Sequence, residues 1–164
     1  MKHIVIGAHG NLAEAFLETV RMIAGTEQTS CIHAIGMKEN MDPQAFIKKA
    51  EELIDEDRDG EYLLLADLFG ASPCNSLLMA FQHCRYRLVT GLNLGMVLEV
   101  LFQFDDMSLE EAAEHMVEIG KGGIQNVICC IRDGRRMHTL EKRRGKNDII
   151  TSNLTCDAVL AGSR

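Results

Sequence analysis

The sequence has no tryptophan, and aromatic residues make up only 5% of its 164 residues. Proteins that bind single-stranded nucleic acids stack the bases on aromatic side chains, so such a surface is not expected here. The formal net charge is −7. Because nucleic-acid backbones need a basic protein face, this charge also argues against a duplex partner. We therefore expect no nucleic-acid partner.

Long apolar runs and metal-binding patterns are missing as well. No apolar stretch approaches the roughly 20 residues that a membrane-spanning helix needs. Met1-Lys2-His3 is followed by only three apolar residues before Gly7, which does not match a signal peptide. The six cysteines form no CxxC pair, and no histidines show zinc-site spacing. We expect a cytoplasmic protein with reduced thiols, no metal and no cofactor.

Charge is distributed unevenly along the chain. Residues 1–131 contain 9 Lys and Arg against 20 Asp and Glu, whereas residues 132–164 contain 8 basic and 4 acidic residues. The two segments therefore carry −11 and +4, which together give the net −7. This shift predicts a main domain over residues 1–131 and a basic C-terminal extension over 132–164.

Apolar periodicity in the main domain switches between two patterns. Short buried runs predict strands, and apolar residues at helical spacing predict helices. The expected strands cover residues 3–6, 28–35, 62–66, 86–89 and 126–131, with weak strand signals at 149–150 and 158–160. The expected helices cover residues 12–24, 43–54, 72–81, 96–104 and 109–120. This alternation predicts an α/β fold with a doubly wound, mostly parallel four-stranded sheet and helices on both faces.

In such sheets, ligands bind beyond the carboxyl ends of the strands. Three glycine-rich loops follow expected strands, at residues 7–11, 67–73 and 90–95. The loop at residues 7–11 contains His9, and the loop at residues 67–73 begins with Asp67. Two of these loops lead into helix N-termini, where free N–H groups and the helix dipole favour an anion. The sequence therefore places one histidine and one carboxylate at an anion-binding sheet edge.

This combination is suited to phosphoryl transfer through a covalent intermediate. An imidazole offers a nucleophilic nitrogen near neutral pH. A carboxylate such as Asp67 can accept a hydrogen bond from the other ring nitrogen, which fixes the tautomer and stabilises the developing positive charge. Backbone N–H groups near Gly10 and Gly70, with the Ser72 hydroxyl, are expected to bind the phosphoryl oxygens.

Each of these residues alone also has a simpler explanation. A histidine after a strand is usually a polar loop residue, Asp67 can cap a turn, and Ser72 before a proline is a common helix N-cap. The other histidines lack a comparable loop context, and we expect them to be structural or surface residues: His3, His33, His83, His115 and His138.

Three motifs resemble a known family. Ile4-Val-Ile-Gly-Ala-His-Gly10, Leu64-Leu-Ala-Asp-Leu-Phe-Gly-Ala-Ser-Pro-Cys-Asn75 and Val89-Thr-Gly-Leu-Asn-Leu-Gly-Met-Val-Leu-Glu99 look like the signatures of mannose-type enzyme IIA components. These belong to the bacterial phosphoenolpyruvate-dependent sugar phosphotransferase system (PTS), in the mannose/fructose/sorbose group. The resemblance covers roughly residues 1–131, with the motifs in the same order. One departure is Gly95, which stands where the family often has proline, so we expect a more mobile loop there.

The resemblance implies a phosphotransferase that accepts a phosphoryl group from phospho-HPr and passes it to a IIB protein during sugar uptake. His9 matches the phosphorylated histidine, Asp67 the carboxylate bonded to its ring, and Ser72 a residue beside the phosphate. The family also implies a homodimer, often with an exchanged C-terminal strand, and indirect association with membrane IIC and IID components. Residues 132–164 would then hold the exchanged strand, a linker remnant or disordered chain.

Two other functional classes remain open at this point. The first is a related phosphohistidine module, either a regulatory domain or the phosphocarrier subunit of a dihydroxyacetone kinase. The second is a doubly wound domain that binds a small molecule without covalent chemistry. The sequence does not name the transported sugar.

Overall fold

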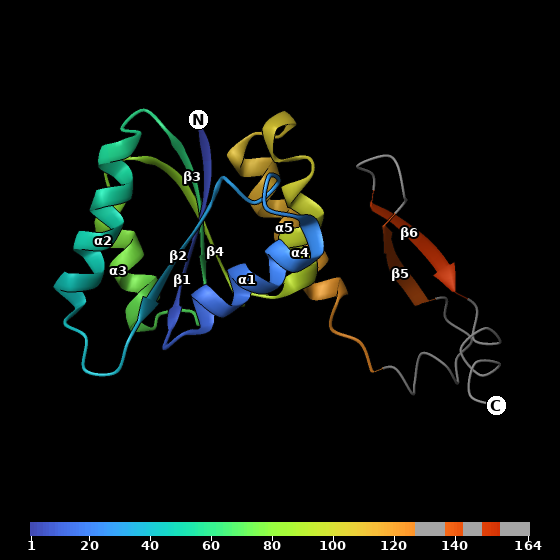
Figure 1. Cartoon of the computed structure of the whole chain (residues 1–164), viewed down its shortest axis with the longest axis horizontal. Coiled ribbons are helices and arrows are strands. Elements are labelled where there is room, and N and C mark those ends of the chain that lie inside the picture. Colours follow the sequence, from blue (N-terminus) through green and yellow to red (C-terminus); the bar gives the residue numbers. More distant parts are fainter. Residues whose placement is uncertain (127–136, 143–148, 155–164) are drawn as a thin grey trace. The chain divides into compact units, whose positions relative to one another are not determined.

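The computed structural model describes residues 1–126, 137–142 and 149–154 (Figure 1). The chain divides into two compact units, Met1–Lys121 and Gly122–Arg164. In the first unit, strands alternate with helices in the order β1 (Lys2–His9), α1 (Leu12–Ala24), β2 (Ile32–Met37), α2 (Pro43–Glu56), β3 (Glu61–Ala66), α3 (Ser72–Ala80), β4 (Arg85–Thr90), α4 (Leu94–Leu101) and α5 (Leu109–Gly122). A short 3₁₀ turn, Phe104–Asp106, lies between α4 and α5.

The four strands form one parallel sheet in the order β2-β1-β3-β4. The chain therefore winds outward from β1 to β2 in one direction and from β3 to β4 in the other. The carboxyl ends of β1 and β3 are neighbours at the point where this direction changes, which is where ligands bind in doubly wound folds. The predicted fold class is confirmed.

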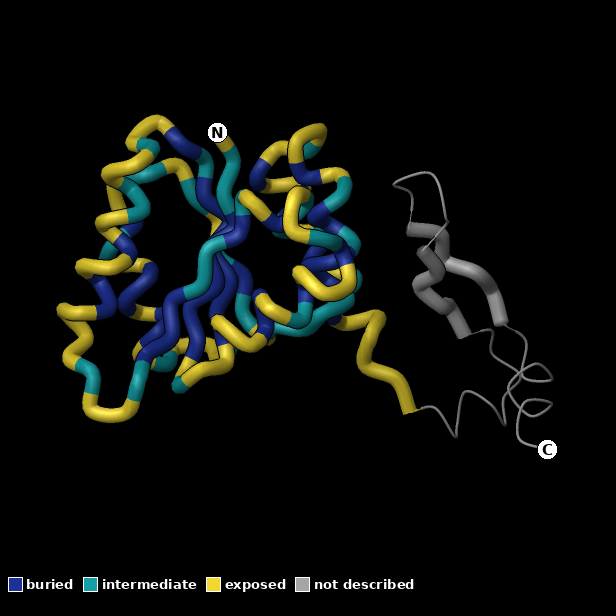
Figure 2. Tube along the Cα trace, in the orientation of Figure 1, coloured by how far each residue is buried: buried dark blue, intermediate teal, exposed yellow. Residues whose placement is uncertain are grey.

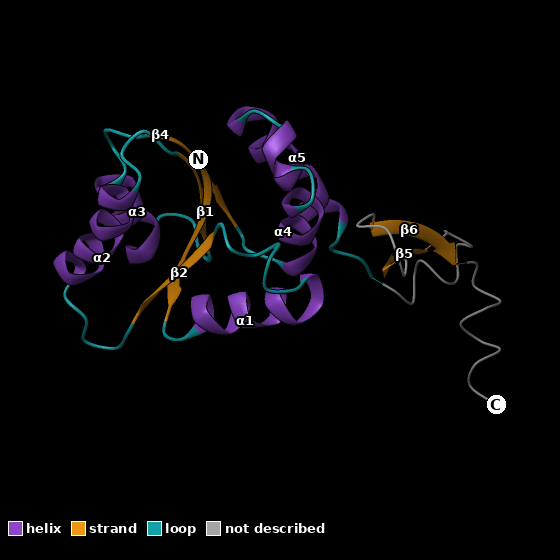
Figure 3. Cartoon of the chain, turned by 45° about the horizontal axis from the view of Figure 1, so that its top comes forward, coloured by secondary structure: helices purple, strands orange, loops and turns teal. Residues whose placement is uncertain are grey.

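The sheet has a hydrophobic core on each face. One core joins alternate residues of β1 and β3 to α1, α4 and α5, and the other joins the opposite residues of the sheet to α2 and α3. Figure 3 shows α2 and α3 on one side of the sheet and α1, α4 and α5 on the other. The strands run through the buried middle of this unit, and exposed residues gather on the outer helices and loops (Figure 2).

Local sequence explains where several helices begin. The Asp42 carboxylate accepts a hydrogen bond from the Gln44 N–H (2.9 Å) just before α2, as expected for an aspartate N-cap. Before α5, the Ser108 hydroxyl accepts from the Glu111 N–H (3.2 Å) and the Glu111 carboxylate accepts from the Ser108 N–H (2.8 Å). This reciprocal pair is a capping box.

Some predicted boundaries are wrong. Residues 28–31 form turns instead of the start of β2, because the Thr29 hydroxyl donates to the Gly25 and Thr26 carbonyl oxygens (3.0 and 3.1 Å) and closes a local turn. Helix α4 starts two residues earlier than expected, since the Asn93 side chain accepts from the Met96 N–H (3.1 Å) and caps it. Gly95, which was expected in a mobile loop, therefore lies in the first turn of α4.

The second unit contains strands β5 (Met137–Lys142) and β6 (Ile149–Leu154), which pair antiparallel. The weak signal at residues 149–150 therefore marks a strand, whereas β5 was not predicted. The expected strand at 126–131 is not present at Asn126, and 127–131 and 158–160 lie outside the described residues. The boundary at residue 131 and the role of residues 132–164 stay predictions. No helix of the described residues is both long and apolar enough to cross a membrane.

Candidate functional site

His9 and Asp67 lie in hydrogen-bonding contact at the carboxyl edge of the sheet. His9 is the last residue of β1, and Asp67 follows the last residue of β3. Because β1 and β3 pair in register from Lys2 with Glu61 to Gly7 with Ala66, both side chains come from the same level of the sheet. The His9 Nδ1 atom lies 2.8 Å from Asp67 Oδ2. The expected proximity of this pair is confirmed.

The Asp67 carboxylate is held by three N–H groups. Its Oδ2 atom accepts from the His9 backbone N–H (2.9 Å) as well as from the ring, and its Oδ1 atom accepts from the Leu68 N–H (2.8 Å). Burial of this side chain, which is 10% exposed, opposes its ionisation. The hydrogen bonds from His9 and Leu68 outweigh that effect and lower the pKa of Asp67 below its ordinary value.

These contacts determine which nitrogen of the ring carries the proton. A carboxylate that is ionised at neutral pH has no proton to give, so it can only accept. The 2.8 Å contact therefore requires a hydrogen on His9 Nδ1. In the neutral imidazole the other nitrogen, Nε2, then keeps its lone pair. The His9 side chain is 48% exposed, which makes the ring accessible from solvent.

The loop after Asp67 leads directly into α3. Gly70 adopts a φ of +72°, a conformation that glycine accepts most easily, and the Asn75 side chain donates to the Gly70 carbonyl oxygen (2.9 Å). Ser72 is the first residue of α3 and is exposed, and Ala71 is the N-cap. Ser72 is therefore not the N-cap of this helix. As the first residue of the helix, it has a backbone N–H with no intrahelical acceptor.

Gly10 takes a different part in the site. It adopts a φ of +59°, and its N–H donates to the Met37 carbonyl oxygen (2.8 Å) at the end of β2. This N–H is therefore engaged by the neighbouring strand, unlike the free donor that the sequence suggested. Gly10 allows the chain to turn sharply after His9 and enter α1.

The third glycine-rich loop packs against the end of β3. The N–H groups of Gly91 and Leu92 both reach the Ala66 carbonyl oxygen (3.1 and 3.4 Å), one residue before Asp67. The Asn93 side chain caps α4 and also donates to the Gly120 carbonyl oxygen (3.4 Å). This loop therefore supports the backbone that carries Asp67.

Large apolar side chains are exposed in the loop that follows Asp67. Phe69 is 90% exposed and Leu68 is 59% exposed, and both directly follow Asp67. Exposed aromatic and aliphatic side chains that lie together commonly mark a surface that binds another protein.

Sequence reasoning missed one residue that contacts the histidine loop. The Lys38 ammonium, from the loop after β2, donates to the Gly10 carbonyl oxygen (3.2 Å), to Asn11 Oδ1 (2.6 Å) and to Glu14 Oε1 (2.9 Å). A lone lysine after a strand carries no sequence signal for such contacts, because its acceptors lie more than 20 residues away in the chain.

Two other histidines form a separate cluster at the opposite end of the strands. His3 is near the start of β1, and its ring nitrogens lie 3.2 Å from His33 Nε2 and 3.0 Å from Asp57 Oδ2. Both imidazoles are partly buried. They join β1, β2 and the end of α2, as expected for structural residues.

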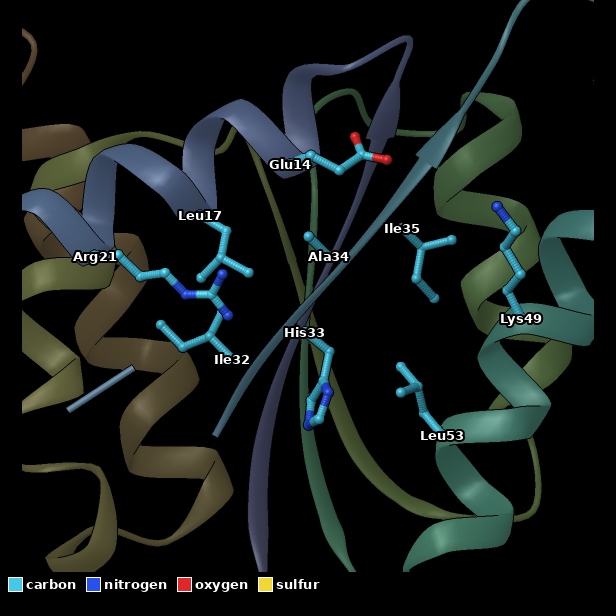
Figure 4. A pocket seen from close by; sticks show the side chains of 9 residues that line it. All are labelled: Glu14, Leu17, Arg21, Ile32, His33, Ala34, Ile35, Lys49 and Leu53. Atoms are coloured by element: carbon cyan, nitrogen blue, oxygen red, sulfur yellow. The ribbon is translucent and has the colours of Figure 1, made fainter. Parts of the chain in front are cut away.

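A cavity of about 410 Å³ lies along the outer edge of β2, between α1 and α2 (Figure 4). Leu17 and Arg21 line it from α1, and Lys49 and Leu53 line it from α2. Neither His9 nor Asp67 is among its lining residues. The candidate site is therefore an open sheet edge and not this cavity.

Comparison with known proteins gives a consistent result. The family model described as "PTS system fructose IIA component" matches residues 3–117. The sorbose-specific EIIA component of the PTS of Klebsiella pneumoniae is 30% identical over 132 residues, which cover 80% of this chain and 91% of that protein. The mannose-specific EIIAB component of Escherichia coli K12 is 31% identical over 127 residues, which cover 74% of this chain but only 38% of that longer protein.

Solved structures agree with these sequence matches. The mannose/sorbose-specific IIA subunit of Enterococcus faecalis superimposes with a TM-score of 0.68 at 29% identity, covering 77% of this chain and 95% of that one. The EIIA component of Streptococcus agalactiae gives a TM-score of 0.66 at 25% identity, covering 79% and 100%.

Proposed function

Because this chain belongs to the family of PTS fructose IIA components, we propose that it carries phosphoryl groups on His9 Nε2. The 2.8 Å contact between His9 Nδ1 and Asp67 Oδ2 is the observation that supports this assignment most directly. In the neutral imidazole, this contact leaves the lone pair on Nε2, and the ring is accessible from solvent. The family makes the chain a phosphocarrier of a sugar PTS; the histidine, the transfer step and the partners are our proposal.

In the proposed step, the Nε2 lone pair attacks the phosphorus of a phosphohistidine on the donor protein. A nitrogen–phosphorus bond forms on His9 as the donor's nitrogen–phosphorus bond breaks, and the donor imidazole leaves with that electron pair. Positive charge develops on the His9 ring, which keeps its Nδ1 proton. The ionised Asp67 stabilises this charge through the existing hydrogen bond. Transfer to the acceptor protein reverses these events.

The phosphoryl oxygens need hydrogen-bond donors during transfer. On the β3 side we propose the Gly70 N–H, the Ser72 N–H and the Ser72 hydroxyl as these donors, since the next helical residue, Pro73, has no N–H. The positive end of the α3 dipole adds to this attraction. Gly10 contributes through the turn that it allows after His9, since its N–H is already bonded to Met37.

We further propose phospho-HPr as the donor and a IIB protein as the acceptor. The exposed Leu68 and Phe69 beside Asp67 supply an apolar surface on which such proteins can dock. A homodimer, indirect association with IIC and IID components and a cytoplasmic location complete the proposal. Among the described residues β4 has only β3 as a neighbour, so one sheet edge is open for a partner subunit.

The test is phosphoryl labelling from ³²P-phosphoenolpyruvate with enzyme I and HPr. We expect an acid-labile phosphate on the wild-type chain and none on His9→Gln. His83→Gln is the matched control, because His83 is exposed and precedes β4, whereas His9 and Asp67 lie at the carboxyl ends of their strands. Label that persists in His9→Gln would refute the assignment, and an unlabelled wild type would favour a domain that binds a small molecule without covalent chemistry.

A further inference from the structure

Lys38 connects the end of β2 to the segment that follows His9. A lysine ammonium has three N–H donors, and Lys38 has three acceptors within hydrogen-bonding distance in this segment: the Gly10 carbonyl oxygen, Asn11 Oδ1 and Glu14 Oε1. The three distances are 3.2, 2.6 and 2.9 Å. A single side chain thus contacts the turn after His9, the residue before α1 and the first turn of α1.

The backbone at the end of β2 contacts the same segment. Met37 accepts from the Gly10 N–H (2.8 Å). The Glu14 side chain extends from α1 toward β2 (Figure 4). Burial opposes ionisation of Glu14, but hydrogen bonds from Lys38 and from backbone N–H groups, including that of Gly36, outweigh it and lower its pKa.

Gly36 shows how closely these segments approach. A Cβ atom at this position would clash with the Gly10 carbonyl oxygen and with both oxygens of the Glu14 carboxylate. Only glycine leaves room for this contact. Residues 36–38 and residues 10–14 are therefore packed against each other, with the Lys38 ammonium bonded across the contact.

From this geometry we propose that Lys38 is a positioning residue for phosphoryl transfer: it tethers the turn after His9 so that the imidazole keeps its orientation toward the incoming phosphoryl group. Asp67 holds His9 from the β3 side through the ring and the backbone N–H. Lys38 holds the following residues from the β2 side. The proposal rests on the phosphocarrier function proposed above.

The competing explanation is an ordinary surface ion pair between Lys38 and Glu14. Both side chains are roughly half exposed, and exposed ion pairs contribute little to stability. Loss of Lys38 should therefore leave the melting temperature nearly unchanged under either explanation. The two differ in transfer rate and in the protection of the Gly10 N–H, because only a tether restrains the turn.

The experiment compares Lys38→Met with Lys48→Met in the full chain. Lys48 is an exposed residue of α2. The control therefore removes the same charge and the same kind of side chain, but at a position outside the contacts between Lys38 and residues 10–14. Single-turnover transfer from ³²P-phospho-HPr gives the maximal rate and the half-saturating donor concentration. Amide hydrogen exchange at Gly10, measured on the unphosphorylated protein, reports the turn independently of function.

For Lys38→Met we expect the maximal transfer rate to fall at least about tenfold, because small losses of positioning are costly in transfer reactions. The half-saturating donor concentration should stay within error, and Gly10 should exchange at least about fivefold faster. Lys48→Met should match the wild type in all three. Equal transfer rates in the two variants, or unchanged exchange at Gly10, would overturn the proposal.

Glu14→Gln separates a tether from a simple effect of charge. A tether predicts slower transfer, because the amide binds the ammonium more weakly. If Lys38 acted only by attracting the phosphoryl group, removing the negative charge of Glu14 would speed transfer, and this result would also contradict the tether. A wild-type chain that takes no label would refute the phosphocarrier function, while the exchange measurement would still test the tether.

Discussion

Replacing Asp67 by asparagine tests the central contact of the site with almost no change in side-chain size. Asp67 Oδ2 accepts from two donors of His9, and Oδ1 accepts from the Leu68 N–H. An asparagine has one acceptor oxygen, and its NH₂ group only donates. Whichever way the amide is oriented, it therefore places donor against donor on one side, and the negative charge is lost.

The size of the effect follows from these contacts. A hydrogen bond to a charged group contributes about 1.5–3 kcal/mol, and each 1.36 kcal/mol of barrier is about tenfold in rate. Because the charge on the His9 ring increases during transfer, the variant should transfer roughly 10- to 150-fold more slowly. With the amide oxygen toward His9, only the Leu68 N–H loses its acceptor, which should lower the free energy of unfolding by about 1–3 kcal/mol.

The assay is rapid-quench, single-turnover transfer from ³²P-phospho-HPr, with thermal unfolding measured on the same samples. Asp59→Asn is the matched control, because Asp59 is an exposed aspartate in the loop before β3 and its replacement removes the same charge. We expect this control to retain wild-type transfer. If Asp67→Asn transfers within twofold of the control, the carboxylate does not stabilise the charged ring, and the reasoning from the 2.8 Å contact fails.

Three further predictions concern docking, packing and pH. Phe69→Ser should raise the half-saturating donor concentration with little change in maximal rate, because this side chain is 90% exposed and touches no reacting atom; steady-state transfer kinetics measure both, and an unchanged half-saturation would contradict a docking role. Gly7→Ala should lower the free energy of unfolding by about 1–3 kcal/mol, since its Cβ would lie 2.8 Å from Leu77 Cδ1 and 3.0 Å from Phe46 Cζ; urea unfolding measures this, and unaltered stability would show that the contact can relax. Burial, together with a neighbouring histidine, lowers the pKa of His33. The folded protein therefore holds this imidazole neutral, while the unfolded chain protonates it near its ordinary pKa of about 6.5. Unfolding then takes up a proton below that pH, so the wild type should lose stability as the pH falls through this range, and His33→Gln should lose less.

Many helix and strand positions can be predicted from local sequence patterns, and the wrong boundaries lie where other hydrogen bonds outweigh those patterns. The apolar run before Asp67 and the helix starts at Asp42 and Ser108 were predictable because caps and buried strands leave short-range patterns. The start of β2 was not, because the β-compatible residues 28–31 are drawn into a turn by the Thr29 hydroxyl. Local hydrogen bonds from a threonine side chain to the backbone can outweigh the strand propensity of a short segment.

The candidate site divides in the same way. His9 and Asp67 could be identified because both follow buried strands in glycine-rich loops, and parallel strands end at one edge. The engagement of the Gly10 N–H and the three bonds of Lys38 could not, because they depend on how closely the end of β2 approaches the turn after His9. That approach depends on Gly36, whose significance appears only when its neighbours are in place.

The sequence by itself determined the order of strands and helices, the residues that follow each strand and the family resemblance of three motifs, because these depend on periodicity and on contiguous residues. The neighbouring positions of β1 and β3 were expected from the fold class, whereas only the tertiary structure gave the complete strand order, with β2 on the other side of β1. That arrangement brings Asp67 to one side of His9 and Lys38 to the other side of the turn that follows it. The residues in these contacts are separated by 58 positions (His9 and Asp67) and by 28 positions (Gly10 and Lys38) in the chain. Such contacts arise from the packing of both faces of the sheet, and no local sequence pattern indicates them.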